Sequence, residues 1–370
     1  MNKKRLHRSA ALLALAAMLL SPGLVTAEDS ENNLQKSFTV SNGGKLVVDA
    51  DRGSIEVAAS GTDKVDVQVL RKVTRGSAAE AEEIFGNHEV TFQQEGNQVT
   101  VKARNKKEAP GWRPWRANLQ VRYVVSVPRQ FNLDLKTAGG SVGVPDLTGD
   151  VRMQTAGGSL KTGAIEGSVW ARTAGGSVTV GGATGAVDVH TAGGSIHIGD
   201  AGAALVAETS GGGITVKNAK QGATVKTAGG SIRIDEANGA VRAETSGGSI
   251  TIKTARGSVN ARTAGGSIDV GEVRGAIDAH TSAGSVRVAM SGPLTEDSRL
   301  DTSGGSISLT IPSDFAADID AKTSGGRVTT DIPVTTQGEL GRGALQGKIG
   351  AGGKLFKLRT SAGSIHIKKL

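Results

Sequence analysis

The sequence contains no cysteine, and aromatic residues make up only 3% of its 370 positions. The absence of cysteine excludes disulfides, thiolate-bound zinc, iron–sulfur clusters and cysteine nucleophiles, and it also excludes a lipoprotein anchored through an N-terminal cysteine. The scarcity of rings argues against a large core built on aromatic side chains. Glycine is abundant instead, with 54 residues. We therefore expect a thin core of small and β-branched side chains.

Residues 1–27 are typical of a secretory signal peptide. A basic start is followed by an apolar run over residues 10–20 and by the small-residue sequence Val25-Thr26-Ala27. The apolar run is shorter than the roughly 20 residues that span a membrane, and we expect no transmembrane segment in the mature chain. Removal of the four basic residues here lowers the formal charge of +8 by four. The remaining charge does not favour a nucleic-acid partner, and the predicted location is the periplasm, the cell surface or the medium.

A single threonine recurs every 18 residues through the middle of the chain. The series runs Thr137, Thr155, Thr173, Thr191, Thr209, Thr227, Thr245, Thr263 and Thr281. Each threonine is followed by alanine or serine, and three residues later by glycine. A second glycine series lies halfway, as at Gly149 and Gly167, so each period consists of two unlike halves of nine residues. A fixed period of this length is the signature of a repeat architecture.

Each nine-residue half predicts one short strand. Val187 and Val189, or Ile232 and Ile234, alternate with polar residues, which is typical of a half-buried strand. The glycine-rich steps between strands supply tight corners. We therefore predict an all-β fold, a single-stranded β-solenoid (β-helix) with 18-residue coils made of two nine-residue halves. Parallel stacking at about 4.8 Å per coil gives a regular rod. Neither its handedness nor the direction in which the threonines point follows from the sequence.

Charges at a spacing of 18 residues support this register. Glu208, Lys226 and Glu244 alternate in sign and fall in one outward column of the expected stack. On the opposite sheet Lys253 follows Asp235 in the same way. Opposite charges on neighbouring strands stabilise a sheet by about 0.2–1 kcal/mol per pair. We interpret these columns as structural and not as a ligand site.

The two ends of the chain depart from the repeat. A solenoid needs caps, because exposed strand edges invite polymerisation. The predicted division is an N-terminal β-rich cap with the first coils over residues 28–136, regular solenoid repeats over 137–292, and irregular C-terminal coils with a cap over 293–370. The cap strands are expected at residues 45–50, 54–58, 65–70, 90–93, 98–103 and 119–127. One short helix is expected at residues 78–85, where Ser77 and Glu80 are arranged as a capping box.

Several motifs carry a resemblance to a known family. Beside the repeated T-[AS]-G-G-S-[IV] pattern, the chain contains Asp51-Arg52-Gly53-Ser54-Ile55-Glu56-Val57, Val125-Ser126-Val127-Pro128 and Thr360-Ser361-Ala362-Gly363-Ser364-Ile365. In this order the motifs resemble the bacterial "putative adhesin" family, an exported β-strand-repeat domain of unknown function. The resemblance covers nearly all of the mature chain. It implies an exported β-solenoid, and it brings no catalytic or ligand-binding residues with it.

Signatures of enzymes and of metal or cofactor sites are missing from the sequence. The histidines after the signal segment have no zinc-site spacing, and we expect them to face solvent; they are His88, His190, His197, His280 and His366. The nonapeptide frame lacks the regular aspartate of calcium-binding β-rolls. Residues 347–354 fail the spacing of a phosphate-binding loop, and no G-x-S-x-G elbow occurs. We expect no catalytic residue, no metal-binding residue and no cofactor.

The least favoured class is a polysaccharide-acting enzyme. The carboxylate pair that glycoside hydrolysis requires would have to come from Asp188, Glu208, Asp269 or Asp278. These residues fall in columns of mixed charge. A cleft of converging acidic groups is therefore not expected.

One segment has the composition of a contact surface. Trp112, Arg113, Trp115 and Arg116 lie within residues 104–116, which hold two of the three tryptophans. Aromatic side chains beside arginine are typical of partner-binding hot spots. Alternatively, both tryptophan rings fold back and seal the first coil. Replacing both by alanine distinguishes the two, because a binding role predicts lost binding at an unchanged melting temperature.

The sequence thus predicts a non-enzymatic exported β-solenoid, an envelope or cell-surface scaffold and adhesin-like binding module. Its expected partner is an envelope glycan or an envelope protein. The alternative is a periplasmic accessory or sensing protein that binds another protein through its N-terminal cap. A pull-down from cell-envelope fractions distinguishes these, since glycan or whole-cell binding favours the first and one stoichiometric protein favours the second. The identity of the partner and the oligomeric state stay open.

Overall fold

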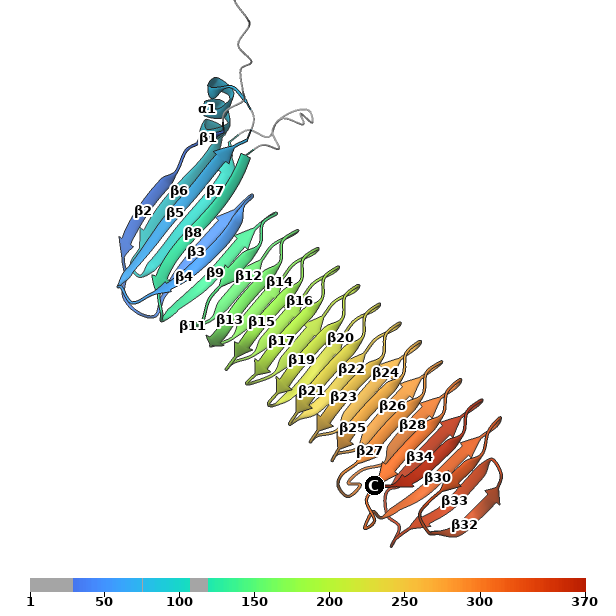
Figure 1. Cartoon of the computed structure of the whole chain (residues 1–370). Coiled ribbons are helices and arrows are strands. Elements are labelled where there is room, and N and C mark those ends of the chain that lie inside the picture. Colours follow the sequence, from blue (N-terminus) through green and yellow to red (C-terminus); the bar gives the residue numbers. More distant parts are fainter. Residues whose placement is uncertain (1–28, 75, 107–118) are drawn as a thin grey trace, which may run out of the picture.

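The computed structural model describes residues 29–74, 76–106 and 119–370. These residues form a rod with a β-rich cap at the N-terminal end and the C-terminal strands at the other end (Figure 1). Two long sheets, here called sheet A and sheet B, run the length of the rod. The described residues contain a single helix, which lies in the N-terminal cap.

In the regular part of the rod, successive strands alternate between the two sheets. The strands of sheet A are β10 (Val142–Val144), β11 (Leu147–Thr148), β13 (Leu160–Glu166), β15 (Val178–Ala183), β17 (Ile196–Ala201), β19 (Ile214–Ala219), β21 (Ile232–Ala237), β23 (Ile250–Ala255), β25 (Ile268–Val273) and β27 (Val286–Met290). The strands of sheet B are β9 (Phe131–Thr137), β12 (Val151–Gln154), β14 (Val169–Arg172), β16 (Val187–His190), β18 (Leu205–Glu208), β20 (Gly222–Lys226), β22 (Ala240–Glu244), β24 (Val259–Thr263), β26 (Ile277–Thr281) and β28 (Ser298–Thr302).

Residues 18 positions apart lie side by side in neighbouring coils. In sheet B, Val151 pairs with Val169, and Val169 pairs with Val187, in parallel register. In sheet A, Val178 pairs with Ile196 in the same way. The prediction of a single-stranded β-solenoid with 18-residue coils in two halves is confirmed.

The core between the sheets is narrow and aliphatic. Inward positions such as Val169 and Ala171 on sheet B, or Ile250 and Ile252 on sheet A, are almost completely buried. β-branched side chains suit this pleated surface because their χ1 angle is already restricted, so that packing in a strand costs them little further side-chain entropy. Trp170 alternates with Val169 and Ala171 along β14 and therefore faces outward.

The threonine ladder points inward and closes one corner of each coil. Thr155 is 4% exposed, and its Oγ1 donates a hydrogen bond to the carbonyl oxygen of Gly140 in the preceding coil at 2.8 Å. The same hydroxyl accepts a bond from the Gly158 amide at 3.4 Å. Both bonds recur at the later threonines as far as Thr281. The buried hydroxyls are thereby satisfied, as buried polar groups must be.

The second glycine of each corner lies directly against the corner of the preceding coil. A Cβ atom at Gly158 would lie 2.1 Å from the carbonyl oxygen of Gly140. A Cβ at the first glycine, Gly157, would lie at an ordinary 3.5 Å from the carbonyl oxygen of Gly139. Close backbone approach therefore requires glycine at the second position.

Both sheets continue into the N-terminal cap, where antiparallel strands cover their edges. The cap elements are β1 (Ser30–Glu31), β2 (Leu34–Thr39), β3 (Gly44–Ala50), β4 (Ser54–Ser60), β5 (Lys64–Val73), α1 (Ala78–Asn87), β6 (His88–Glu95), β7 (Gln98–Asn105) and β8 (Leu119–Pro128). Strand β5 pairs antiparallel with β2 and β8, and β6 with β7. The predicted helix begins after Ser77, which forms the predicted capping box with Glu80. Strands β1 and β2 were not predicted.

At the C-terminal end, the order of strands in space differs from their order in sequence. The elements are β29 (Ile307–Ile311), β30 (Ala317–Thr323), β31 (Val328–Thr330), β32 (Val334–Gly341), β33 (Ala344–Ile349), β34 (Leu355–Thr360) and β35 (Ile365–Lys369). Strand β34 inserts between β28 and β30, and β35 inserts between β29 and β31. Thr360 accordingly bonds the Gly305 carbonyl and Thr323 bonds the Gly363 carbonyl, which continues the ladder.

Candidate binding site on sheet B

The predicted partner-binding residues lie outside the part of the chain that the structure describes. These residues are Trp112, Arg113, Trp115 and Arg116. Their role in contacting a partner therefore stays a prediction. The outward surface of the rod offers a different candidate.

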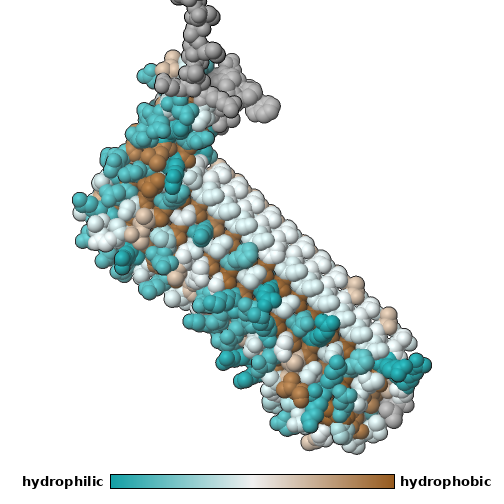
Figure 2. Space-filling view, in the orientation of Figure 1, coloured by the Kyte–Doolittle hydropathy of each residue, from teal (hydrophilic) through white to brown (hydrophobic). Residues whose placement is uncertain are grey.

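The charge columns predicted from the sequence are present. Lys226 Nζ lies 3.7 Å from Glu244 Oε2 on the neighbouring strand of sheet B. On sheet A, Lys253 Nζ lies 2.8 Å from Asp235 Oδ1, and this hydrogen bond lowers the pKa of Asp235 below its usual value. Figure 2 shows hydrophilic residues gathered in patches on the visible face, beside a pale strip of residues of intermediate hydropathy along one edge of the rod. Paired charges of this kind stabilise the stack and leave little free charge for a ligand.

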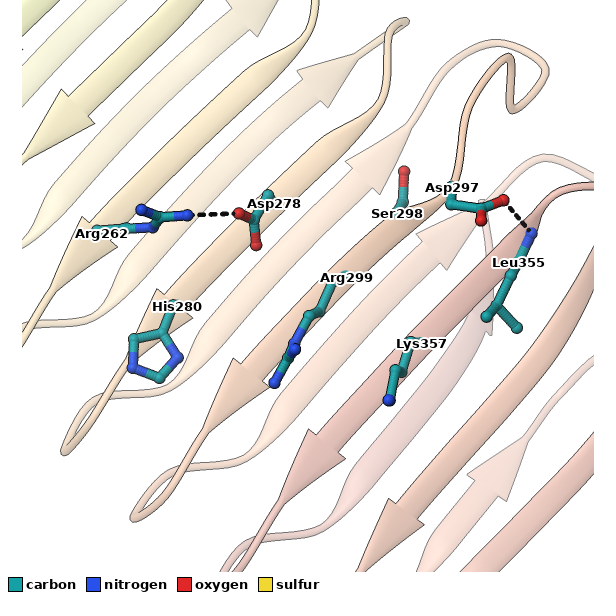
Figure 3. A pocket seen from close by; sticks show the side chains of 8 residues that line it. All are labelled: Arg262, Asp278, His280, Asp297, Ser298, Arg299, Leu355 and Lys357. Carbon is teal, nitrogen blue, oxygen red and sulfur yellow. Dashed lines mark hydrogen bonds and ion pairs between the residues drawn. The ribbon is translucent and has the colours of Figure 1, made fainter.

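A hollow opens on the outward face of sheet B where the repeat first slips. The interval from Thr281 to Thr302 is 21 residues instead of 18, and sheet B then takes β34 as the neighbour of β28. The hollow measures about 650 Å³ and lies over β24, β26, β28 and β34 (Figure 3). Its lining residues are Arg262, Asp278, His280, Asp297, Ser298, Arg299, Leu355 and Lys357.

Two cationic side chains extend side by side at this hollow. Arg299 on β28 and Lys357 on β34 are direct neighbours in register, and Figure 3 shows them pointing the same way. Asp301 binds the Arg299 guanidinium, and this hydrogen bond raises the pKa of Arg299 further. His280 Nδ1 lies 3.5 Å from Asp301 as well. Lys357 forms no ion pair with any described residue. Its register neighbour on β30, Asp320, is ion-paired with Arg359 and interacts with Lys357 only at longer range.

The carboxylates at the hollow already have partners. Asp278 Oδ2 accepts a hydrogen bond from the Arg262 guanidinium at 2.8 Å. Asp297 Oδ1 accepts one from the backbone amide of Leu355 at 3.0 Å. The Leu355 side chain is 37% exposed and adds an apolar surface beside the charges. The free hydrogen-bonding capacity of the hollow is therefore mainly that of donors.

Donors without free carboxylates suit anion binding and do not suit acid–base catalysis. Hydrolysis of a glycosidic bond needs two carboxyl groups able to exchange protons, and Asp278 and Asp297 are held by other groups. Ser298 is buried, and its Oγ accepts a hydrogen bond from the Ile277 amide at 3.0 Å, so it is not poised as a nucleophile. Across residues 29–74, 76–106 and 119–370 no cluster of three histidine, cysteine or acidic residues could hold a metal ion.

The carboxylates considered for sugar hydrolysis do not converge. Asp188 and Glu208 both contact the imidazole of His190. Asp278 lies in the same outward column as Asp188 but five coils further along, and Asp269 lies on sheet A. The four carboxylates therefore do not form the pair that glycoside hydrolysis requires.

His88 contradicts the expectation that the histidines face solvent. Its side chain is completely buried at the start of β6, with Nε2 3.6 Å from Asp51 Oδ1. Burial lowers the pKa of His88 below the ordinary 6.5, although Asp51 opposes this shift. The prediction was wrong because it rested on the lack of zinc-site spacing, which does not determine burial, whereas the turn from α1 into β6 directs this ring into the cap. The other described histidines are exposed or half-buried.

The hollow itself was not predicted from the sequence. Its residues come from strands that are separated by almost a hundred positions, and the insertion of β34 beside β28 brings them together. The one available signal was the break in the threonine spacing after Thr281. A break of this kind marks where a solenoid face changes shape.

The fold and this face define a two-sheeted β-solenoid with a donor-rich hollow on its outer surface. The chain belongs to the Toastrack DUF4097 family, whose pattern matches residues 44–262 and 254–368. The two matched segments together cover most of the chain, so the predicted family resemblance is confirmed. A search of curated proteins finds no match.

Solved structures with a similar chain path include several described as adhesion proteins. A "putative cell adhesion protein" from Clostridium sporogenes is 8% identical, covers 92% of this chain and 100% of its own, and has a TM-score of 0.23. A "putative adhesin" from Bacteroides fragilis is 14% identical over 92% and 98%, with a TM-score of 0.25. A "putative lipid binding protein" from Parabacteroides distasonis is 13% identical over 92% and 97%, with a TM-score of 0.27. These scores are too low to carry an argument about function.

The single described helix does not have the length and hydropathy needed to cross a membrane.

Proposed function

We propose that the protein is a non-enzymatic, exported scaffold of the cell envelope or cell surface that binds an anionic glycan through the outward face of sheet B. The observation that carries this proposal is the hollow at β28 and β34. There Lys357 forms no ion pair among the described residues, since the carboxylate of its neighbour Asp320 is taken by Arg359, and Arg299 lies on its other side. A charged donor that stays unpaired among paired neighbours is available to a ligand.

The architecture supports a polymeric partner. A β-solenoid repeats its outward positions at about 4.8 Å along the rod, so successive groups of an extended polymer meet equivalent places on the face. The exposed Leu355 side chain beside Lys357 offers contact to the apolar face of a sugar ring. Export through the signal segment at residues 1–27 would bring the rod to envelope glycans.

The test is a titration of residues 28–370 with polygalacturonate, an acidic polysaccharide, and with neutral dextran as the control polymer. We expect saturable binding of the acidic polymer only. Lys357→Ala should raise the Kd at least tenfold, because loss of a hydrogen bond to a charged group costs on the order of 1.5–3 kcal/mol. The matched control is Lys217→Ala on sheet A, an exposed lysine that likewise has no ion pair among the described residues.

Three outcomes would contradict the proposal. If dextran bound as tightly as polygalacturonate, binding would not depend on charge. If the Lys357 and Lys217 variants lost the same amount of affinity, the binding site would not be the hollow. If size-exclusion chromatography showed that the polysaccharide became shorter during incubation with the protein, the protein would be an enzyme. Fractionation of cells that left the protein in the cytoplasm would contradict export.

A further inference from the structure

Trp170 carries an aromatic ring onto the outward face of sheet B. It lies on β14, and its direct neighbours in register are Arg152 on β12 and Asp188 on β16. The tryptophan is half-buried, while Arg152 and Arg172 are exposed. An outward tryptophan requires an explanation, because residues 137–292 of the regular coils contain no other aromatic residue.

Two arginine side chains stack on this one ring. Arg152 Cζ lies 3.5 Å from the centroid of the Trp170 ring, and Arg172 Cζ lies 4.7 Å from it. Stacking occupies the flat face of a guanidinium and leaves the N–H groups at its edge free to donate. Neither arginine forms an ion pair with any described residue. The ring therefore holds two cationic forks whose donors face solvent.

The nearest carboxylates do not neutralise these forks. Asp134, the neighbour of Arg152 on the other side, accepts a hydrogen bond from Lys45 Nζ at 3.3 Å. Asp188, the neighbour of Trp170, contacts the imidazole of His190. Both carboxylates are thus engaged with other side chains.

A second site on sheet B has the same outward residues but lacks the ring, and it shows what the ring changes. Five coils further along, the same outward residue types recur at equivalent places, except that asparagine replaces tryptophan. The two sets are Trp170, Arg172, Asp188 and His190, and Asn260, Arg262, Asp278 and His280. Without the ring, Arg262 bonds its neighbour Asp278 at 2.8 Å. With the ring, Arg172 stacks on Trp170, so the ring diverts this arginine from the equivalent carboxylate.

We propose that Arg152, Trp170 and Arg172 form a second anion site on the binding face, an arginine clamp that takes the carboxylate of an acidic sugar. A guanidinium fork matches the two oxygens of a carboxylate, and prior stacking on the ring reduces the entropy lost on binding. A phosphate group would carry nearly twice the charge, and the nearby carboxylates of Asp134 and Asp188 would repel it more strongly. This inference rests on the proposed function and names its ligand class.

The clamp and the hollow lie along one line on the rod. Trp170 and Arg299 occupy the same outward column of sheet B, seven coils apart. At about 4.8 Å per coil the separation is roughly 34 Å. One acidic polysaccharide of that length can engage both sites, and the second contact then gains from a high effective concentration.

The test uses a short ligand that cannot bridge the two sites, tetragalacturonate. In a Trp112→Phe, Trp115→Phe background, Trp170 is the one remaining tryptophan, and its fluorescence reports occupancy of the clamp. We expect a saturable fluorescence change. Arg172→Gln should raise the Kd at least tenfold, and Trp170→Asn should do the same in calorimetry, because it recreates the Asn260 arrangement.

The matched control is Arg242→Gln, an outward arginine of the same column that already pairs with Glu244. We expect it to leave both the affinity and the fluorescence change intact. Lys357→Ala should spare the fluorescence change with the tetramer and weaken binding of long polygalacturonate. Equal melting temperatures of the variants would exclude a folding defect.

The clamp is overturned if tetragalacturonate leaves the fluorescence unchanged, or if its affinity is the same in the Arg172 and Arg242 variants. Inorganic phosphate that bound the clamp as tightly as the tetramer would overturn the choice of a carboxylate. In each of these cases, the binding of long polygalacturonate and its dependence on Lys357 still decide the proposed function separately.

Discussion

The threonine ladder of the regular coils and the interior of the N-terminal cap differ in how their buried polar groups are satisfied. In the coils each threonine of the ladder from Thr155 to Thr281 makes the same pair of bonds, as Thr209 does with the Gly194 carbonyl at 2.8 Å and the Gly212 amide at 3.4 Å. In the cap, the imidazole of His88 and the hydroxyl of Tyr123 are buried without a hydrogen-bond partner. Burial accordingly raises the pKa of Tyr123 above its usual value and lowers that of His88.

The two regions should therefore lose stability through different changes. A solenoid gains stability from interactions between neighbouring coils, so a corner that fits once can be repeated along the rod. The cap interrupts that repetition, and its buried polar atoms carry the cost of incomplete hydrogen bonding. We expect the coils to be sensitive to corner geometry and the cap to be sensitive to charge.

The largest effect is expected from a corner glycine. Gly158→Ala places a Cβ atom 2.1 Å from the Gly140 carbonyl oxygen, so the two coils must separate. Strain of this kind costs about 3 kcal/mol. Gly157→Ala in the same corner places its Cβ at 3.5 Å and should change stability by less than about 0.5 kcal/mol. Denaturant unfolding of both variants checks this, and equal stability would show that the corners do not approach as described.

The cap should lose stability as the pH falls. Burial holds the folded-state pKa of His88 below its ordinary 6.5, so below about pH 6.5 the unfolded state takes up a proton that the folded state resists. The contribution of the neutral His88 to the free energy of unfolding is therefore fully present above pH 6.5. It is lost progressively as the pH falls from 6.5 to the folded-state pKa. The groups facing this ring are Asp51, which opposes the shift, and Arg71 and Arg52, which reinforce it.

Hydrogen exchange at β6 and β8, measured between pH 7.5 and 5, checks this expectation. Exchange in the cap should become less protected, after correction for intrinsic rates, while that in β20 and β22 stays constant. His88→Gln should flatten the pH dependence, whereas His197→Gln, at an exposed histidine on sheet A, should preserve it. A cap whose protection did not change with pH would argue against a neutral buried imidazole.

Replacing a single threonine of the ladder should lower the free energy of unfolding by less than replacing a corner glycine. Thr209→Val removes the hydroxyl that bonds the Gly194 carbonyl, and the expected loss is about 1 kcal/mol. Thr215→Val in the same coil is the control, because Thr215 is half-buried on the outward side of sheet A. If chemical denaturation gave the same free energy of unfolding for both variants, the threonine ladder would not stabilise the coils.

The smallest effect is expected at the surface ion pairs. Asp235→Asn breaks the contact with Lys253, and the loss should stay below about 0.5 kcal/mol because the pair is exposed. The pKa of Asp235 is lowered, so this contribution is present at neutral pH and is lost as the pH falls below the ordinary 3.8. A loss comparable to that of Gly158→Ala would mean that the charge columns determine the register.

The repeat could be predicted because the same residue pattern recurs in every coil. Eighteen-residue spacing fixed the pairing of Val151 with Val169, and the side-chain alternation fixed which face is buried. The helix after Ser77 was predictable because a capping box is a local signal. These features depend only on residues that are near one another in sequence or at one constant interval.

The features that were missed depend on single long-range choices. The segment at Thr360 carries the same corner motif as its neighbours, so its pattern fits stacking beyond β30 as well as insertion beside β28. The hollow follows from that insertion and was missed with it. The inward turn of His88 depends on how α1 packs into the cap, which no local pattern encodes.

The central claim is that the hollow and the clamp lie on one straight face, with one coil added for every repeat. Because the chain has no cysteine, spin labels can be placed in pairs at introduced cysteines. Val206→Cys would be paired in turn with Asn260→Cys, Arg299→Cys and Lys357→Cys, which lie three, five and six coils away in the same column. A straight column with one coil per repeat predicts distances that grow linearly, to about 14, 24 and 29 Å. Distances that failed to increase in this order would contradict it.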